Sequence, residues 1–139
     1  MGMIYAEIEL INAIDLGNAK SNKIGEDEIK RIRVNMLVDT RSMYMCINES
    51  VREQLQLSIV EKRKGVLADG NVVEYDVAGP IEVRFKNRRC VVDAMVLPGR
   101  NELHLGAIPM EDMDVLINPT RRELIVNPEH PDIAVMIMK

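Results

Sequence analysis

Apolar and polar residues alternate along much of this chain, which is the pattern of half-buried β-strands. Residues 3–12 form the first such segment, and its apolar side chains share one face: Ile4, Ala6, Ile8 and Leu10. Residues 31–38 alternate in the same way, so the two segments are expected to pair as an antiparallel hairpin. Between them, residues 13–29 are polar and predict a long exposed connection with a helical turn near its end.

The middle of the chain predicts two further hairpins. Asp69-Gly70 lies between β-type runs at residues 59–67 and 72–77, and Asp-Gly in that position is a strong hairpin signal. Gly79-Pro80 is expected to turn the chain, after which residues 81–85 and 90–97 pair around residues 86–88. These segments bring the expected total to eight or nine short strands.

Two short helices and an apolar tail complete the expected elements. Asn48 can cap a helix over residues 49–55, and residues 107–113 predict a second helix. Short strands are expected at residues 115–117 and 124–126. The tail at residues 129–139 is apolar from residue 133 onward, so it is expected to pack on the domain or on a partner.

Composition narrows the partners and the cellular location. The 139 residues match the size of one domain, and with no Trp and 3% aromatic residues the core must be aliphatic. The lack of aromatic platforms and the net charge of −4 argue against nucleic acid and anionic membranes as partners. No signal peptide or membrane-spanning run is visible, so a cytoplasmic protein is expected. The Cys and His residues lack metal-ligand spacing, and no metal or other cofactor is expected.

The candidate for chemistry is Asp39, which follows directly on the β-type run ending in Leu37-Val38. A carboxylate there is positioned by a buried strand and made accessible by the loop after it. By itself, Asp39-Thr40 is more typical of an ordinary turn than of a functional acid. The features that favour a functional acid lie further along the chain.

The order of motifs resembles that of retropepsin-like aspartic peptidases of the single-domain bacterial type. Leu37-Val38-Asp39-Thr40 resembles the Asp-Thr-Gly motif of that family. The further matching segments are Ile47–Val51 with Leu55 and Leu57, the hairpin tip at Ala68, Asp69, Gly70 and Asn71, and the stretches Leu103–Gly106 and Asp114–Pro119. Together they cover about residues 3–128.

This resemblance implies a mainly β, closed β-barrel of the acid-protease fold, with one or two short helices, as one domain over residues 1–139. It implies a homodimer, because each chain has one Asp-Thr element and two carboxylates must share a proton to activate water. In the family, Thr40 would hydrogen-bond across the dimer, and Ser42 is expected to bond the outer oxygen of Asp39. The hairpin at residues 65–75 would act as a flap over a peptide, and Leu105 and Gly106 would form a second core loop.

Arg41 departs from the family pattern, which has Gly at this position. A guanidinium beside Asp39 favours the ionised carboxylate and opposes a shared proton. Two main hypotheses follow: an aspartic endopeptidase acting on peptides as a homodimer, and a catalytically degenerate dimerisation or peptide-binding module of the same fold. A third hypothesis is a plain β interaction domain in which Asp39 is a turn residue.

Overall fold

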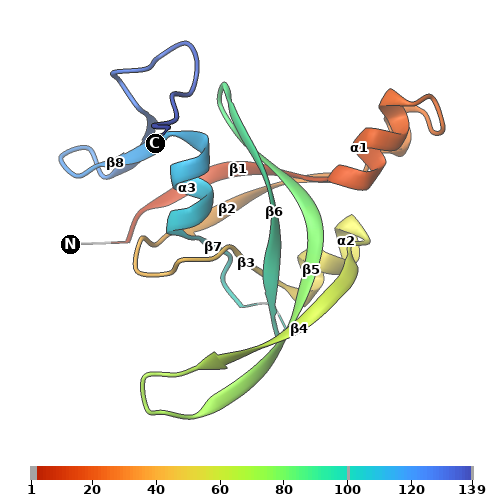
Figure 1. The fold of residues 1–139 in the computed structure, drawn as a ribbon, viewed down its shortest axis with the longest axis horizontal. Coiled ribbons are helices and arrows are strands. Elements are labelled where there is room, and N and C mark those ends of the chain that lie inside the picture. The colour runs from red at the N-terminus through yellow and green to blue at the C-terminus, as the bar shows by residue number, and fades with distance from the viewer. Residues whose placement is uncertain (1–2, 100, 139) are drawn as a thin grey trace.

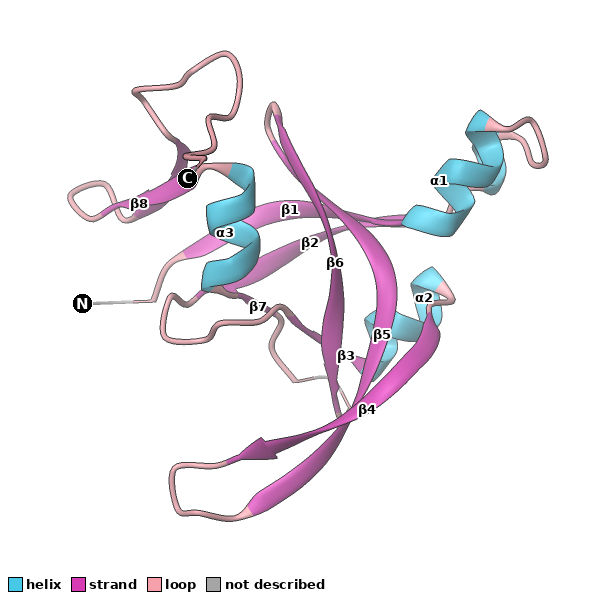
Figure 2. Cartoon of the chain, viewed as in Figure 1, coloured by secondary structure: helices cyan, strands magenta, loops and turns pink. Residues whose placement is uncertain are grey.

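The computed structural model describes residues 3–99 and 101–138 and is mainly β, as predicted (Figures 1 and 2). Nine strands are present in the described part of the chain: β1 (Tyr5–Asn12), β2 (Arg31–Val38), β3 (Cys46–Asn48), β4 (Ser58–Val66), β5 (Val72–Phe85), β6 (Arg88–Leu97), β7 (His104–Leu105), β8 (Val115–Asn118) and β9 (Glu123–Val126). The helical segments are α1 (Ala13–Lys20), the 3-10 helix η1 (Glu26–Glu28), α2 (Glu49–Leu55) and α3 (Ala107–Met113).

Seven of the strands form one sheet in the order β1-β2-β7-β3-β6-β5-β4, and β1 also pairs with β5. Because β1 has partners on both edges, the sheet closes into a ring of strands. The predicted β1–β2 hairpin is confirmed, with Tyr5 opposite Leu37, and so is the hairpin that joins β5 to β6. Two pairings are parallel, β2 with β7 and β3 with β6, while β8 and β9 form a separate antiparallel pair.

The ring encloses an aliphatic core, as the composition required. Its fully buried side chains come from five strands (β1, β2, β3, β5 and β7), from the residue before β3, and from α2 and α3: Ile8, Leu10, Met36, Met45, Ile47, Leu55, Ile81, Val83, Leu105 and Met113. The predicted inward face of β1 is confirmed, since Ile4, Ala6, Ile8 and Leu10 are all buried. This core is what holds the end of β2 in place.

Both predicted helices form with the expected bounds. The Asn48 side chain accepts a hydrogen bond from the Val51 N–H at 2.9 Å, which caps α2 and satisfies one of its free donors. Val51 and Leu55 face the core from α2, and Met110 and Met113 do so from α3. These contacts attach both helices to the ring.

Helix α1 was not predicted, because residues 13–29 were expected to be an exposed connection. The Asn12 side chain accepts from the Ile14 and Asp15 N–H groups and so starts the helix. None of the α1 side chains is buried, and the helix projects from the ring in Figure 2. A helix that buries no face leaves no apolar period in the sequence, so only its cap could have revealed it.

The turn predicted at Gly79-Pro80 is wrong, since β5 continues through these residues. The peptide bond between them is cis, and the ladder with β6 shifts register between Ala78 and Ile81. Proline has no N–H to donate, so pairing is interrupted here without the strand ending. No helix within the described ranges is long and apolar enough to cross a membrane.

Candidate active site

Asp39 lies where β2 leaves the core, and backbone hydrogen bonds hold it from two sides. The Val38 N–H donates to Ile4 O at 2.8 Å, and the Asp39 N–H donates to Leu105 O at 3.1 Å. The Asp39 side chain is 16% exposed, so its carboxylate is partly accessible. The strand therefore places this acid with little freedom, as the sequence predicted for a functional position.

Leu105 and Gly106 lie directly against Asp39 and the loop that follows it. A Cβ on Gly106 would lie 2.3 Å from Tyr44 O and 2.7 Å from Ser42 O, so only glycine fits this approach of two backbones. Just after it, the Ala107 N–H donates to Ser42 O at 2.8 Å and the Ile108 N–H donates to Met43 O at 2.9 Å. The start of α3 thus fixes the conformation of residues 42–44.

Arg41 folds back onto Asp39 and contacts both of its carboxylate oxygens. Its backbone N–H donates to Asp39 Oδ1 at 3.0 Å, its Nε donates to Oδ1 at 3.1 Å, and its Nη2 donates to Oδ2 at 3.3 Å. The side-chain hydrogen bond from Arg41 is the main cause that lowers the pKa of Asp39, and partial burial opposes it. The Arg41 side chain is otherwise 89% exposed, so the rest of the chain does little to hold it there.

The neighbouring residues take different roles from those expected. The Ser42 hydroxyl donates to Tyr44 O at 3.1 Å, so the predicted bond from Ser42 to Asp39 is wrong: a hydroxyl has one proton to donate. The Thr40 side chain is exposed and makes no hydrogen bond to any described residue. His104 lies half-buried on β7, where its proximity is a minor cause of the lowered pKa of Asp39.

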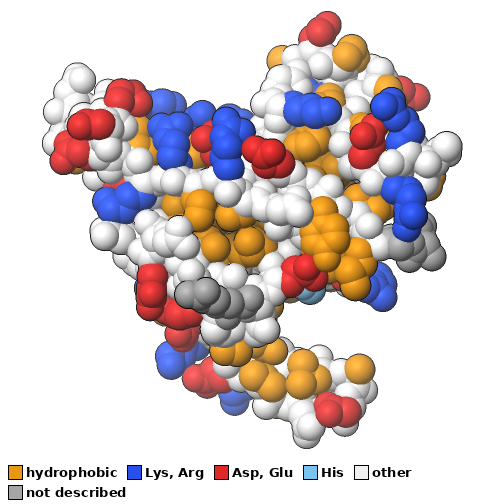
Figure 3. Space-filling view, turned by 180° about the vertical axis from the view of Figure 1, so that it is seen from behind, with side chains coloured by type: hydrophobic (Ala, Val, Ile, Leu, Met, Phe, Trp, Pro, Cys, Tyr) orange, Lys and Arg blue, Asp and Glu red, His pale blue; other side chains and the backbone are white. Residues whose placement is uncertain are grey.

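The predicted flap-like hairpin is an arm formed by β4 and the first half of β5. Its tip is closed by the Leu67 N–H donating to Asn71 O at 2.8 Å, and Gly70 adopts a φ of +86°, which favours glycine. Asp69 accepts from the Asn71 N–H at 2.9 Å, while Ala68 is exposed beside it. Figure 3 shows the arm extending away from the molecule, with a hollow between it and the body.

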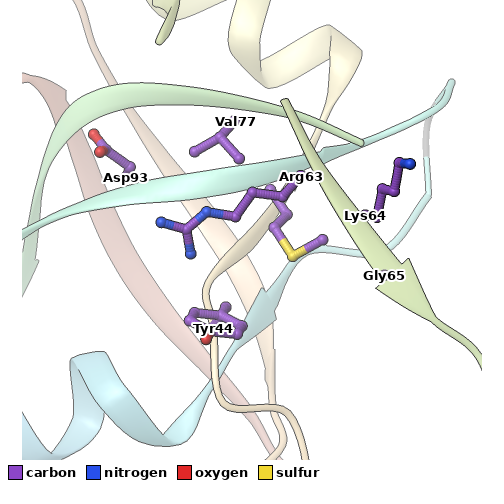
Figure 4. A pocket seen from close by; sticks show the side chains of 7 residues that line it. Tyr44, Arg63, Lys64, Gly65, Val77 and Asp93 are labelled. Atoms are coloured by element: carbon purple, nitrogen blue, oxygen red, sulfur yellow. The ribbon is translucent and has the colours of Figure 1, made fainter. Parts of the chain in front are cut away.

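A groove of about 300 Å³ lies at the base of this arm, and the sequence did not reveal it. Its lining combines the inner face of the arm, the loop after Asp39 and β6: Tyr44, Arg63, Lys64, Gly65, Val77, Asp93 and Met95. In Figure 4 the Arg63 side chain points into the groove, whereas Lys64 points away from it. Strand alternation places residues 61, 63 and 65 on one face of β4, which is the signal that could have found this lining.

A second cavity, of about 360 Å³, lies beside Asp39 itself. Its lining comes from the N-terminal segment, the end of β2 and β8: Met3, Ile4, Leu37, Val38, Asp39, Thr40, Arg41 and Ile117. The structure therefore brings Asp39, Thr40 and Arg41 to one open surface, with Leu105 and Gly106 beneath them. The tip residues Ala68–Asn71 line neither this cavity nor the groove at the base of the arm.

No protein-family model and no curated protein sequence matches this chain. Solved structures do match it. The retroviral protease-like domain of Ddi1 from Leishmania major has 13% identity and a TM-score of 0.56, covering 92% of this chain and 90% of that one. EIAV protease complexed with the inhibitor HBY-793 has 14% identity and a TM-score of 0.56, covering 84% and 93%. The chain has a retropepsin-like fold, as predicted, and at these identities the likeness shows the fold alone.

Proposed function

We propose that this protein is an aspartic-type endopeptidase that cleaves peptides as a homodimer, with one Asp39 from each chain. The observation that carries the proposal is the position of Asp39: an accessible carboxylate on a rigid strand end, with the Arg41 backbone N–H donating to its Oδ1. Any residue except proline at position 41 would supply that backbone N–H. The retropepsin-like fold supports the proposal by providing an arm and a groove on which a peptide can lie.

In the proposed reaction, water lies between the two Asp39 carboxyl groups. The ionised carboxylate accepts a proton from the water, whose oxygen attacks the peptide carbonyl, while the protonated partner donates its proton to the carbonyl oxygen. Breakdown of this tetrahedral intermediate returns a proton to the leaving amine and releases both products. In this proposal Thr40, whose exposed side chain lines the cavity beside Asp39, would hydrogen-bond across the dimer next to the dyad.

Arg41 sets the condition under which this reaction can run. A dyad needs one proton between two carboxylates, and a guanidinium on each carboxylate opposes that proton. The Arg41 side chain is 89% exposed, and ion pairs with so exposed a partner are weak and screened by salt. The proposal therefore expects activity at acidic pH, with Arg41 displaced from Asp39 by the bound peptide.

The contact between Arg41 and Asp39 supports a second candidate, a dimer that binds peptides without hydrolysing them. If Arg41 stays on Asp39 in the dimer, both carboxylates remain ionised and water is not activated. The groove and the arm would still hold an extended peptide. Binding without cleavage is the property that separates this candidate from the first.

The test is cleavage of a mixed peptide library at pH 3–7, read by mass spectrometry, for four proteins. Wild type is expected to cleave, Asp39→Asn to lose cleavage, and Arg41→Gly to cleave with a pH profile moved to higher pH. The direction follows because removal of the guanidinium raises the pKa of Asp39, so the shared proton persists to higher pH. Arg33→Gln is the control, since Arg33 is also exposed and pairs with Glu7 far from the site.

Three results decide between the candidates. Cleavage by Arg41→Gly but not by wild type at any pH supports the non-hydrolytic candidate. Cleavage that survives in Asp39→Asn assigns the chemistry to another residue or to a contaminant. If neither wild type nor Arg41→Gly cleaves while both are dimeric and bind peptides, the peptidase proposal is wrong.

A further inference from the structure

The C-terminal segment carries the largest run of exposed apolar side chains in the described part of the chain. Ile133, Met136 and Ile137 are 74, 68 and 87% exposed, and Val135 and Met138 are also exposed. These residues follow position 128, where the retropepsin-like motifs end. We call residues 133–138 the C-terminal tail. This segment was expected to pack either on its own domain or on a partner. The first alternative is wrong, since the side chains are not buried on the domain.

Specific hydrogen bonds hold the backbone before the tail to the body. Two donors come from the turn between β5 and β6 and from the start of β6: Asn87 Nδ2 donates to Pro131 O at 2.9 Å, and the buried Arg88 donates its Nη2 to His130 O. Because Arg88 is buried, its bond leaves the segment little freedom of position. The tail therefore starts from a defined point on the molecule.

Asp114, at the end of α3, holds the start of the tail itself. Its Oδ2 accepts the Val135 N–H at 3.0 Å and lies 2.8 Å from His130 Nδ1, while its Oδ1 accepts from Asn127 Nδ2 at 3.1 Å. These contacts order the backbone while leaving the apolar side chains in solvent. An ordered and exposed apolar segment is typical of a surface that binds another protein.

The position of the tail indicates that the protein it binds is a second copy of this chain. Residues 134–137 run beside Glu111 and Asp112 of α3, and Glu111 also borders an apolar groove of about 290 Å³ next to Thr40. The apolar part of that groove is formed by Ala107, Met110, Val115, Leu116 and Ile117. In Figure 1 the C-terminus lies on the same side of the molecule as β8 and the loop after β2. This is the side on which two Asp39 residues would meet.

We propose that the tail of one chain covers the apolar groove beside Thr40 of a second copy, and that the second copy reciprocates. The inference rests on the proposed function for the position of the two-fold axis. Tail and groove adjoin in one chain at Glu111, so a two-fold axis that passes between them places each tail next to the other chain's groove. The five exposed apolar side chains carry roughly 400 Å² per tail, so two tails and the surfaces they cover reach roughly 1,600 Å², the usual size of a stable interface.

Sedimentation velocity between about 1 and 100 µM tests this contact in the full-length protein. The variant is the double change Ile133→Asp and Ile137→Asp. The control is Ile14→Asp, since Ile14 is 51% exposed and its helix α1 projects from the opposite side of the molecule (Figure 1). We expect the double variant to raise the dimer Kd by about 100-fold or more and the control to leave it unchanged. Truncation after residue 132 should reproduce the double variant.

Hydrogen exchange gives a second readout that does not depend on a variant. The backbone amides of residues 136–138 should exchange slowly at 100 µM and quickly at concentrations where the protein is monomeric. A double variant that dimerises like wild type, or tail amides unprotected in the dimer, overturns the tail contact. If peptide cleavage persists in that case, the proposed function stands. A wild-type protein that is monomeric at 100 µM overturns both.

Discussion

The sharpest stability prediction concerns Gly106→Ala, because the added methyl would meet backbone and not a movable side chain. Its Cβ would lie 2.3 Å from Tyr44 O, 2.7 Å from Ser42 O and 2.8 Å from Met43 C. Carbon–oxygen contacts are ordinarily no closer than about 3.3 Å, so the loop or the start of α3 must move by about 1 Å. Nothing in this region can absorb that change by a rotamer shift.

The loss in the free energy of unfolding can be estimated from the contacts that this movement disturbs. Overpacking costs about 1–3 kcal/mol. The displaced loop also weakens the hydrogen bonds from Ala107 N–H and Ile108 N–H to the loop carbonyls, each worth about 1 kcal/mol. We expect Gly106→Ala to lower the free energy of unfolding by about 3–5 kcal/mol, and the melting temperature by about 10–15 °C for a domain of this size.

Gly17→Ala is the matched control. A Cβ on Gly17 meets nothing within 4 Å, and the residue lies in the exposed helix α1. Alanine is the better helix former by about 1 kcal/mol, so this change should be neutral or slightly stabilising. Urea unfolding of both variants at one protein concentration gives the comparison. A loss below about 1 kcal/mol for Gly106→Ala, with an unchanged m-value, would refute the close approach of the two backbones.

Three further predictions concern the Asn48 helix cap, the hydrogen bonds that Asp114 accepts, and the loss of stability at acidic pH. Asn48→Ala should cost about 1–2 kcal/mol in urea unfolding, because the side chain caps α2 and also donates to Asn101 O at 2.7 Å. Asp114→Asn should speed hydrogen exchange of the segment after residue 127, whereas Asp112→Asn, on the exposed side of α3, should not. The contacts of Asp114 lower its pKa from 3.8 to about 2, so the stability they confer is complete above about pH 4 and is lost as the pH falls toward 2. The free energy of unfolding should therefore fall less steeply between about pH 4 and pH 2 in Asp114→Asn than in wild type. An unchanged pH dependence would contradict the stabilising role of Asp114.

Local patterns in the sequence were enough for most of the elements. Alternation predicted β1 and β2, Asp69-Gly70 predicted the tip of the arm, and Asn48 predicted the start of α2. Each of these signals acts over a few residues, so each can be read before the chain folds. The turn expected at Gly79-Pro80 shows the limit, because a proline at an interrupted ladder and a proline in a turn look alike in sequence.

The candidate site was partly predictable for the same reason. Asp39 at a strand end and Arg41 two residues later are neighbours in sequence, and the lowered pKa of Asp39 follows from that proximity. The partner of Ser42 was not predictable, because a hydroxyl within reach of two acceptors is decided by the path of the loop. The groove at the base of the arm was also hidden, since Tyr44, Arg63 and Asp93 meet only when three separate segments pack.

The sequence by itself determined the mainly β character, the aliphatic core and the acid at the end of β2, because periodicity, composition and neighbouring residues are local properties. Only the tertiary structure decided that β1 pairs with both β2 and β5, and that Gly106 presses against the loop after Asp39. These outcomes depend on contacts between segments far apart in the chain. Their energies exist only once the ring has closed.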